Sequence, residues 1–292
     1  MERFPTEIIL DIAAYLDLTG DKPTLASLAA CSRKYVKIVQ PILFRTIRPS
    51  TNTQMLRLLF TLKMKVGISA LLKELILFRT LELGTVALLT EILENGHLGH
   101  LEVLRFQRYC LPSDGTNRFS CLARAIACNS FFPALRVLEV TSFCLANSIN
   151  ANPKSIFMLA SSFPKLEELY LRRSLTFDHA MLPRLRALQA SITSADLDGP
   201  LRAVNLRYLC THPSDVDFRY LAQLSAVTGG QLLSLECSGL ALWDLPILLE
   251  ANGKSFKWMG EAFPHLRYLG SVRIHPELVS RSVDCSTNPM TI

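Results

Sequence analysis

Apolar residues recur through most of this chain in one short phrase: leucine, two variable residues, leucine, one variable residue and a third, usually apolar, residue. Side chains alternate between the two faces of a β-strand, so we expect the first, fourth and sixth positions to point into a core. The third and fifth positions should then face away from it. The eight copies are LKELIL from Leu72, LEVLRF from Leu101, LRVLEV from Leu135, LEELYL from Leu166, LRALQA from Leu185, LRYLCT from Leu206, LLSLEC from Leu232 and LRYLGS from Leu266.

The spacing of these phrases indicates a repeat architecture. Their leading leucines are separated by 29, 34, 31, 19, 21, 26 and 34 residues, which is typical of leucine-rich repeats. Helical patterns separate several copies, and one repeat cannot bury its apolar face alone. We therefore predict an α/β fold, an irregular leucine-rich-repeat solenoid with a curved parallel sheet and helices on its convex side. The helical patterns cover residues 85–96, 118–127, 153–163 and 214–227.

The first 45 residues carry a helical period instead. A first helix is expected directly after Pro5, with Thr6 as its cap. Its apolar residues follow the three-and-four spacing that places them on one stripe. The stripe is wide for so short a helix, and the excess apolar surface predicts a partner. Its members are Ile8, Ile9, Ile12, Ala13 and Leu16.

Two more short helices should follow. Asp21 and Pro23 predict the start of the second, and Ser32 can cap the third, which we expect to stop at Gln40-Pro41. About forty residues bury too little surface to be stable alone. The apolar residues of the second and third helices are Leu25, Leu28, Ala29, Tyr35, Val36 and Val39.

The order of these residues resembles the F-box motif, most of all in F-box proteins of fungi. The resemblance rests on Phe4-Pro5-x-Glu7-Ile8-Ile9, Leu16, Leu25, Leu28, Cys31-Ser32-Arg33 and Val39, followed by a Gln-Pro-x-Leu-Phe exit. It implies that the helices dock on a Skp-type adaptor, and through it on a cullin scaffold. The adaptor-binding residues would be Phe4, Pro5, Ile8, Ile9, Ile12, Leu16 and Leu28.

The same resemblance implies that the chain is the substrate-recruiting subunit of a Skp-cullin-F-box ubiquitin ligase, whose solenoid binds the target protein. Two alternatives stay open. The chain could be a free-standing leucine-rich-repeat interaction scaffold whose N-terminal helices only cap the solenoid, or it could bind nucleic acid through its basic stretch. Neither recurring basic residues along the repeats nor a known reader motif favours nucleic acid.

These patterns suggest four segments. Residues 1–48 form the F-box-like helical module, which ends with a possible capping strand at 45–47. Residues 49–71 form a connecting helix. Residues 72–272 form the solenoid, and residues 273–292 form a C-terminal cap or tail.

Charge is concentrated near the N-terminus. The net charge is +6, and residues 22–73 contain ten Lys or Arg and no Asp or Glu. This stretch is either a set of solvated helix faces or a docking surface for an acidic protein partner.

Catalytic and metal-binding patterns are missing from the sequence. The eight cysteines show no CxxC spacing, so we expect mostly buried thiols. His97 and His100 lack a third local ligand, and the Asp178-His179 pair has no serine in a G-x-S-x-G turn. No phosphate loop or dinucleotide-binding glycine pattern occurs. We expect a non-enzymatic protein without cofactor or metal.

Protein binding through the outward positions of the repeats is the function that remains. Tyrosine and arginine are enriched at binding hot spots. The candidate target-binding residues are Tyr170, Arg186, Arg207, Tyr208 and Tyr268. No secretory signal or run of about eighteen uncharged apolar residues is present. We therefore expect an intracellular protein of cytoplasm or nucleus, with no membrane partner.

Overall fold

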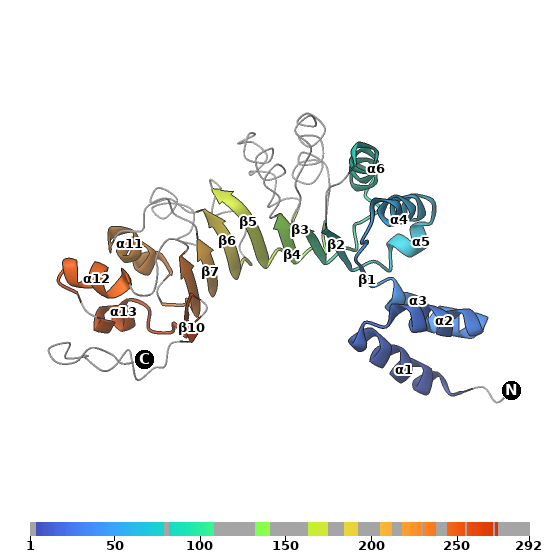
Figure 1. Cartoon of the computed structure of the whole chain (residues 1–292), viewed down its shortest axis with the longest axis horizontal. Helices are drawn as coiled ribbons and strands as arrows, with labels where there is room; N and C mark the ends of the chain where they lie inside the picture. The colour runs from blue at the N-terminus through green and yellow to red at the C-terminus, as the bar shows by residue number, and fades with distance from the viewer. Residues whose placement is uncertain are drawn as a thin grey trace. The chain divides into compact units, whose positions relative to one another are not determined.

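The structure, drawn in Figure 1, is a computed structural model. The chain divides into two compact units. The first unit comprises Met1–Ser148 with Ser162–Lys165, and the second comprises Ile149–Ser161 with Leu166–Ile292. The structure describes residues 4–78, 82–107, 132–140, 163–174, 184–191, 205–211, 218–228, 230–237, 244–254, 256–270 and 272–273.

The first unit begins with a helical module of three helices, α1 (Thr6–Thr19), α2 (Lys22–Cys31) and α3 (Arg33–Leu43). The module has its own core, in which Ile9, Ala13, Leu25 and Val39 are buried. As predicted, Asp21 caps α2 by accepting a hydrogen bond from the Thr24 amide, and Ser32 caps α3 by accepting one from the Tyr35 amide. The three predicted helices are therefore confirmed.

Two predicted helix ends were wrong. Pro5, not Thr6, is the residue before α1, and no side chain caps that end. Pro41 does not stop α3, which continues to Leu43. Pro41 has no amide hydrogen to donate to the residue four positions earlier, but only Ile42 and Leu43 follow it in the helix.

Four parallel strands follow in chain order in the first unit: β1 (Thr46–Ile47), β2 (Glu74–Phe78), β3 (Val103–Gln107) and β4 (Val137–Val140). The predicted capping strand is β1, and the predicted connecting helix is α4 (Asn52–Met64), followed by α5 (Val66–Ser69). The helix α6 (Leu83–Glu94) joins β2 to β3 and contacts α4. Lys63 on α4 and Glu91 on α6 form an ion pair of 2.6 Å.

The second unit repeats the arrangement. Its strands β5 (Glu168–Ser174), β6 (Ala187–Ser191), β7 (Tyr208–Thr211), β8 (Ser234–Cys237) and β9 (Tyr268–Leu269) are parallel neighbours, and β10 (Val272–Arg273) returns antiparallel to β9. Its helices are α11 (Phe218–Thr228), α12 (Asp244–Ala251) and α13 (Phe256–Ala262). The Ser225 hydroxyl on α11 donates to the Ala262 carbonyl at 2.9 Å.

The predicted inward positions of the phrases are confirmed. Each of the eight strands β2 to β9 begins at the third residue of one copy. The first and fourth positions are buried in every copy except at Leu266, which is half-buried. The sixth position is buried wherever its side chain is described, even where it is Thr211 or Cys237. Helices α6 and α11 match two predicted helical segments. The segment 118–127, the segment 153–163 apart from Phe163, and the tail 274–292 lie outside the described residues.

Phenylalanines that precede three phrases add to this core. Phe132, Phe163 and Phe263 are all buried, and the rings of Phe132 and Phe163 stack at 5.5 Å between centroids. Each is followed by proline, which lacks an amide hydrogen and so needs no backbone partner there. The fold is thus α/β, with parallel strands in chain order and leucines as the shared core of neighbouring repeats.

Candidate protein-binding surfaces

Helix α1 has two apolar faces. Ile9 and Ala13 are buried in the module core. On another face Ile8, Ile12 and Tyr15 are 44%, 41% and 66% exposed. Because a helix turns once every 3.6 residues, the spacings of four and three put these exposed residues on one stripe. We call Ile8, Ile12 and Tyr15 the α1 apolar stripe.

Two more apolar residues are exposed at the ends of α1. Phe4 precedes the helix and is exposed, and Leu18 at its far end is exposed as well. Contiguous apolar surface that stays in water is costly, and it typically marks a protein or membrane contact. This arrangement suits a partner with an apolar groove.

The structure separates the predicted adaptor-binding residues into three groups. Phe4, Pro5, Ile8 and Ile12 are exposed. Leu16 and Leu28 are partly buried against the module core. Ile9 corrects the prediction, because it is fully buried and its side chain is unavailable to a partner. Sequence reasoning missed Tyr15, whose signal was its spacing of three and seven residues from Ile12 and Ile8.

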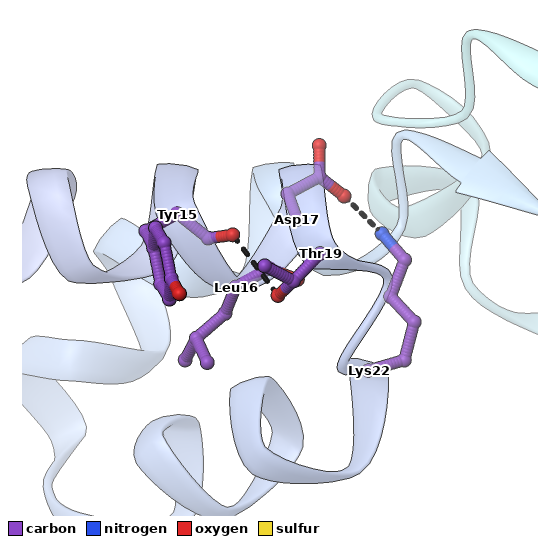
Figure 2. A network of polar contacts seen from close by, with 5 residues as sticks. All are labelled: Tyr15, Leu16, Asp17, Thr19 and Lys22. Atoms are coloured by element: carbon purple, nitrogen blue, oxygen red, sulfur yellow. Dashed lines mark hydrogen bonds and ion pairs between the residues drawn. The ribbon is translucent and has the colours of Figure 1, made fainter.

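A compact turn fixes the end of α1 (Figure 2). The Thr19 hydroxyl donates to the carbonyl oxygens of Tyr15 and Leu16, both at 3.1 Å. Gly20 adopts a left-handed conformation with φ of 73°, and its amide donates to the Asp17 carbonyl at 3.1 Å. Lys22 forms an ion pair with the Asp17 carboxylate. These contacts hold α1 at a set angle to α2 and so orient the stripe.

Basic side chains gather at the start of α3. Arg33, Lys34 and Lys37 are all exposed, and Arg33 and Lys34 lie in its first turn. Positive charge is unfavourable at a helix N-terminus, where the backbone dipole is already positive. At the start of α2, hydrogen bonds from Thr24 lower the pKa of the Asp21 carboxyl and keep it a charged cap. The exposed basic residues of α3 form a positively charged surface suited to an acidic partner.

Outward positions of the first unit are internally paired. At the second position of neighbouring phrases, Lys73 and Glu102 form an ion pair of 3.1 Å. At the fifth position, Arg105 of β3 and Glu139 of β4 are paired at 2.9 Å, in register on adjacent strands. Opposite charges directly across a ladder stabilise a sheet. These two ion pairs therefore stabilise the first unit.

Outward positions of the second unit differ. Tyr208 and Tyr268 occupy the third position, are 50% and 42% exposed, and flank Ser234 in the same register. Arg186 and Arg207 immediately precede β6 and β7 and are exposed. The structure thus places four of the five predicted target-binding residues on accessible outward positions.

Tyr170 stands apart from the other four. It is the fifth residue of its phrase, and its register partner on β6 is Gln189, whereas Tyr208 aligns with Ala187. Its side chain is half-buried, and its hydroxyl donates to the Glu168 carboxylate at 2.9 Å. The predicted contiguous patch of Tyr170, Arg186 and Tyr208 therefore spans two separate columns of the sheet.

Two cysteines lie beside this surface on opposite sides of the sheet. Burial is the main cause that raises the pKa of Cys210 to about 11 and that of Cys237 to about 12, with the nearby Glu236 carboxylate adding to both. Such thiols are poor nucleophiles at neutral pH. Cys31, by contrast, is exposed, so the prediction of a buried thiol was wrong there. The other five cysteines lie outside the described residues.

Within the described ranges, no group of three or more His, Cys, Asp or Glu side chains is placed to hold a metal ion. The described helices include none with the length and apolarity needed to span a bilayer. The Asp178-His179 pair lies outside the described residues.

No protein-family model matches the chain, and no curated protein matches it.

Proposed function

We propose that the chain is a non-catalytic receptor of the F-box type, which docks on a Skp-type adaptor through α1 and recruits a target protein with its repeats. The observation that carries this proposal is the α1 apolar stripe. The core of the module is built from other residues, Ile9, Ala13, Leu25 and Val39, and the side chains of the stripe remain exposed. A surface left apolar without a structural need is best explained by a partner.

The repeats support the recruiting half of the proposal. Eight phrases, each starting a strand at its third position, fit a leucine-rich-repeat solenoid. Such an architecture presents an extended surface built from outward strand positions. A receptor of this kind promotes ubiquitin transfer by holding the target near the conjugating enzyme, which raises its effective concentration. The ligase subunits and the target are parts of the proposal that rest on the resemblance of the first 45 residues.

An adaptor pull-down with the full chain tests the proposal. We expect Ile8→Asp/Ile12→Asp to abolish capture of a Skp-type adaptor, because charge without a partner in a desolvated interface costs several kcal/mol, on the order of 3–5. Leu10→Asp is the matched control. Leu10 is 43% exposed on the same helix, but it lies away from the stripe. The thermal unfolding of all variants should stay cooperative.

Full adaptor binding by Ile8→Asp/Ile12→Asp would refute the F-box proposal. It would favour the second candidate, a leucine-rich-repeat scaffold whose helices only cap the repeats. One observation favours that candidate, namely that the helical module and strands β1 to β4 fall into one compact unit. If the helices are only a cap, their exposed stripe should tolerate both aspartates without loss of any partner.

A further inference from the structure

We propose that the second unit binds an extended acidic protein segment along a row of three arginines, Arg186, Arg207 and Arg267. This inference rests on the proposed role of the repeats in target recruitment and adds the chemistry of the target. Each arginine is the second residue of its phrase and directly precedes a strand. We call these three residues the arginine row.

Backbone hydrogen bonds hold the row in register. The Arg186 carbonyl accepts from the amides of Arg207 and Tyr208 at 2.8 and 3.0 Å. The Arg207 carbonyl accepts from Leu233 and Ser234, and the Leu233 carbonyl from Arg267 and Tyr268. Arg186, Arg207, Leu233 and Arg267 are thus successive rungs of one ladder. A rigid ladder lets a ligand meet all three guanidinium groups with little loss of backbone entropy.

Among the described residues, the arginines of this row form no ion pair, unlike the charges at the same phrase position in the first unit. There, the same phrase position carries Lys73 and Glu102 on adjacent rungs, and the two neutralise each other at 3.1 Å. In the part of the second unit that the structure describes, no ion pair involves an arginine of the row. Arg184 and His265, which precede the rungs of Arg186 and Arg267, are also exposed. The arginine row and these neighbours form a basic surface, bordered by Glu167 on the rung before Arg186.

Like charges on adjacent rungs destabilise the free protein. Arg186 and Arg207 lie directly opposite each other, and like-charged cross-strand pairs are unfavourable. The second unit thus carries a like-charged pair, Arg186 and Arg207, at the phrase position where Lys73 and Glu102 of the first unit carry opposite charges. An anionic ligand would relieve the repulsion, and guanidinium groups bind carboxylates with two parallel hydrogen bonds.

The spacing of the row defines the ligand. Neighbouring strands are about 4.8 Å apart, so the three steps from Arg186 to Arg267 span about 14 Å. An extended chain advances about 3.3 Å per residue, so about five residues cover the row. Leu233 occupies the third rung, so we expect the ligand to carry an apolar residue opposite it. Tyr208 and Tyr268 lie one residue further along their strands and can pack against the ligand.

The surroundings favour a short protein segment over nucleic acid. Glu167 occupies the rung before Arg186, because its carbonyl accepts from the Arg186 amide at 2.7 Å. Glu236 is exposed on β8, two residues beyond Ser234. A long polyanion would meet these carboxylates, whereas a five-residue segment ends within the basic row.

Fluorescence anisotropy with the full chain provides the test. The probe is a labelled peptide with blocked ends, Glu-Glu-Ser-Leu-Glu, and its counterpart carries lysine in place of each glutamate. We expect Arg186→Gln/Arg207→Gln/Arg267→Gln to weaken binding of the acidic peptide by about tenfold or more. The charge-matched control is Arg219→Gln/Lys254→Gln/Lys257→Gln, which removes exposed cations elsewhere in the same unit and should bind as the wild type does. Added salt should weaken wild-type binding.

A second measurement, the melting temperature of the ligand-free protein, tests the repulsion between the arginines of the row. Arg207→Gln should raise the melting temperature, since it removes a like-charge neighbour, while it weakens peptide binding. Equal binding of the acidic peptide by wild type and the row variant would overturn the inference. So would tighter binding of a labelled ten-nucleotide single strand than of the peptide, which would point to nucleic acid.

The adaptor pull-down keeps the two proposals apart. If the row variant captures the adaptor but the wild type ignores the acidic peptide, only the inference about target chemistry fails. If Ile8→Asp/Ile12→Asp still captures the adaptor while the row variant loses the peptide, only the F-box proposal fails.

Discussion

Ile8 and Ile9 are neighbours in sequence but lie in opposite environments on α1. Ile9 is buried in the module core with Ala13, Leu25 and Val39, whereas Ile8 is exposed in the α1 apolar stripe. The same side chain therefore serves stability at one position and is free for a partner at the next.

This pair gives a matched prediction. Ile9→Ala should lower the free energy of unfolding by about 2–5 kcal/mol, because it leaves a cavity in a small core. Ile8→Ala should change it by less than about 0.5 kcal/mol, because the side chain is already in water. Urea unfolding followed by circular dichroism measures both values. Adaptor capture should show the reverse order, and equal destabilisation by the two variants would contradict the assignment of faces.

Leu169 and Tyr208 offer a comparable contrast in the second unit. Leu169 is fully buried at the fourth position of its phrase, and Tyr208 is half exposed at the third position of another. Leu169→Ala should cost about 2–5 kcal/mol, a large share of a total stability of roughly 5–15 kcal/mol. Tyr208→Ala should cost well under 1 kcal/mol, since exposed substitutions usually do.

The outcome is read from equilibrium unfolding and from recovery of co-purified proteins. Tyr208→Ala should reduce target recovery while Leu169→Ala mainly reduces yield of folded protein. A shift below about 1 kcal/mol for Leu169→Ala would mean that the inward positions do not form one continuous core.

Much of the fold could be predicted because one repeated leucine phrase accompanies each of the strands β2 to β9. The repeated phrase predicted buried leucines at its first and fourth positions, and Leu101 and Leu104 are examples that the structure confirms. The two faces of α1 were harder to predict from the sequence. The predicted stripe included both Ile8 and Ile9, but adjacent helical residues differ by about 100° in direction, and so small a core accommodates only one of them.

The charge relationships could not be read from the sequence. Whether Lys73 finds a carboxylate depends on the register that places Glu102 on the next rung. The same phrase position holds Arg186 and Arg207 on adjacent rungs, where no carboxylate intervenes. The phrases align the second positions of neighbouring copies, but only the structure shows that the side chains of Lys73 and Glu102 form an ion pair.

The turn after α1 yields a prediction about the stability of the helical module. Gly20 has a φ of 73°, and a left-handed conformation costs an L-residue about 1–2 kcal/mol. Gly20→Ala should therefore destabilise the module by about that amount, although no atom lies within 4 Å of the added methyl group. Gly67→Ala is the control, because Gly67 lies in α5 without a positive φ and alanine favours helix there. Chemical denaturation measures the free energy of unfolding of both variants. If Gly20→Ala is as stable as the wild type, backbone strain at Gly20 is excluded.

The final prediction concerns Cys210 and Cys237, whose pKa values burial raises to about 11 and about 12. In the unfolded chain both thiols ionise near their ordinary pKa of about 8.5. The folded state therefore holds their protons more tightly, and the resulting stability is fully present below about pH 8.5 and is lost as the pH rises toward the folded values. Iodoacetamide reacts with the thiolate, so at pH 8 both cysteines should be alkylated slowly in the native protein and rapidly in urea.

Mass spectrometry of the digested protein assigns the label to each cysteine, with the exposed Cys31 as the reactive control. Cys237→Ala should make the decline in stability between about pH 8.5 and 10 shallower, because one proton-linked group has been removed. Native alkylation of Cys237 as fast as that of Cys31 would show that its sulfur is reached by solvent. In that case the sixth position of the β8 phrase would not belong to the buried core, and the inward assignment would fail at that repeat.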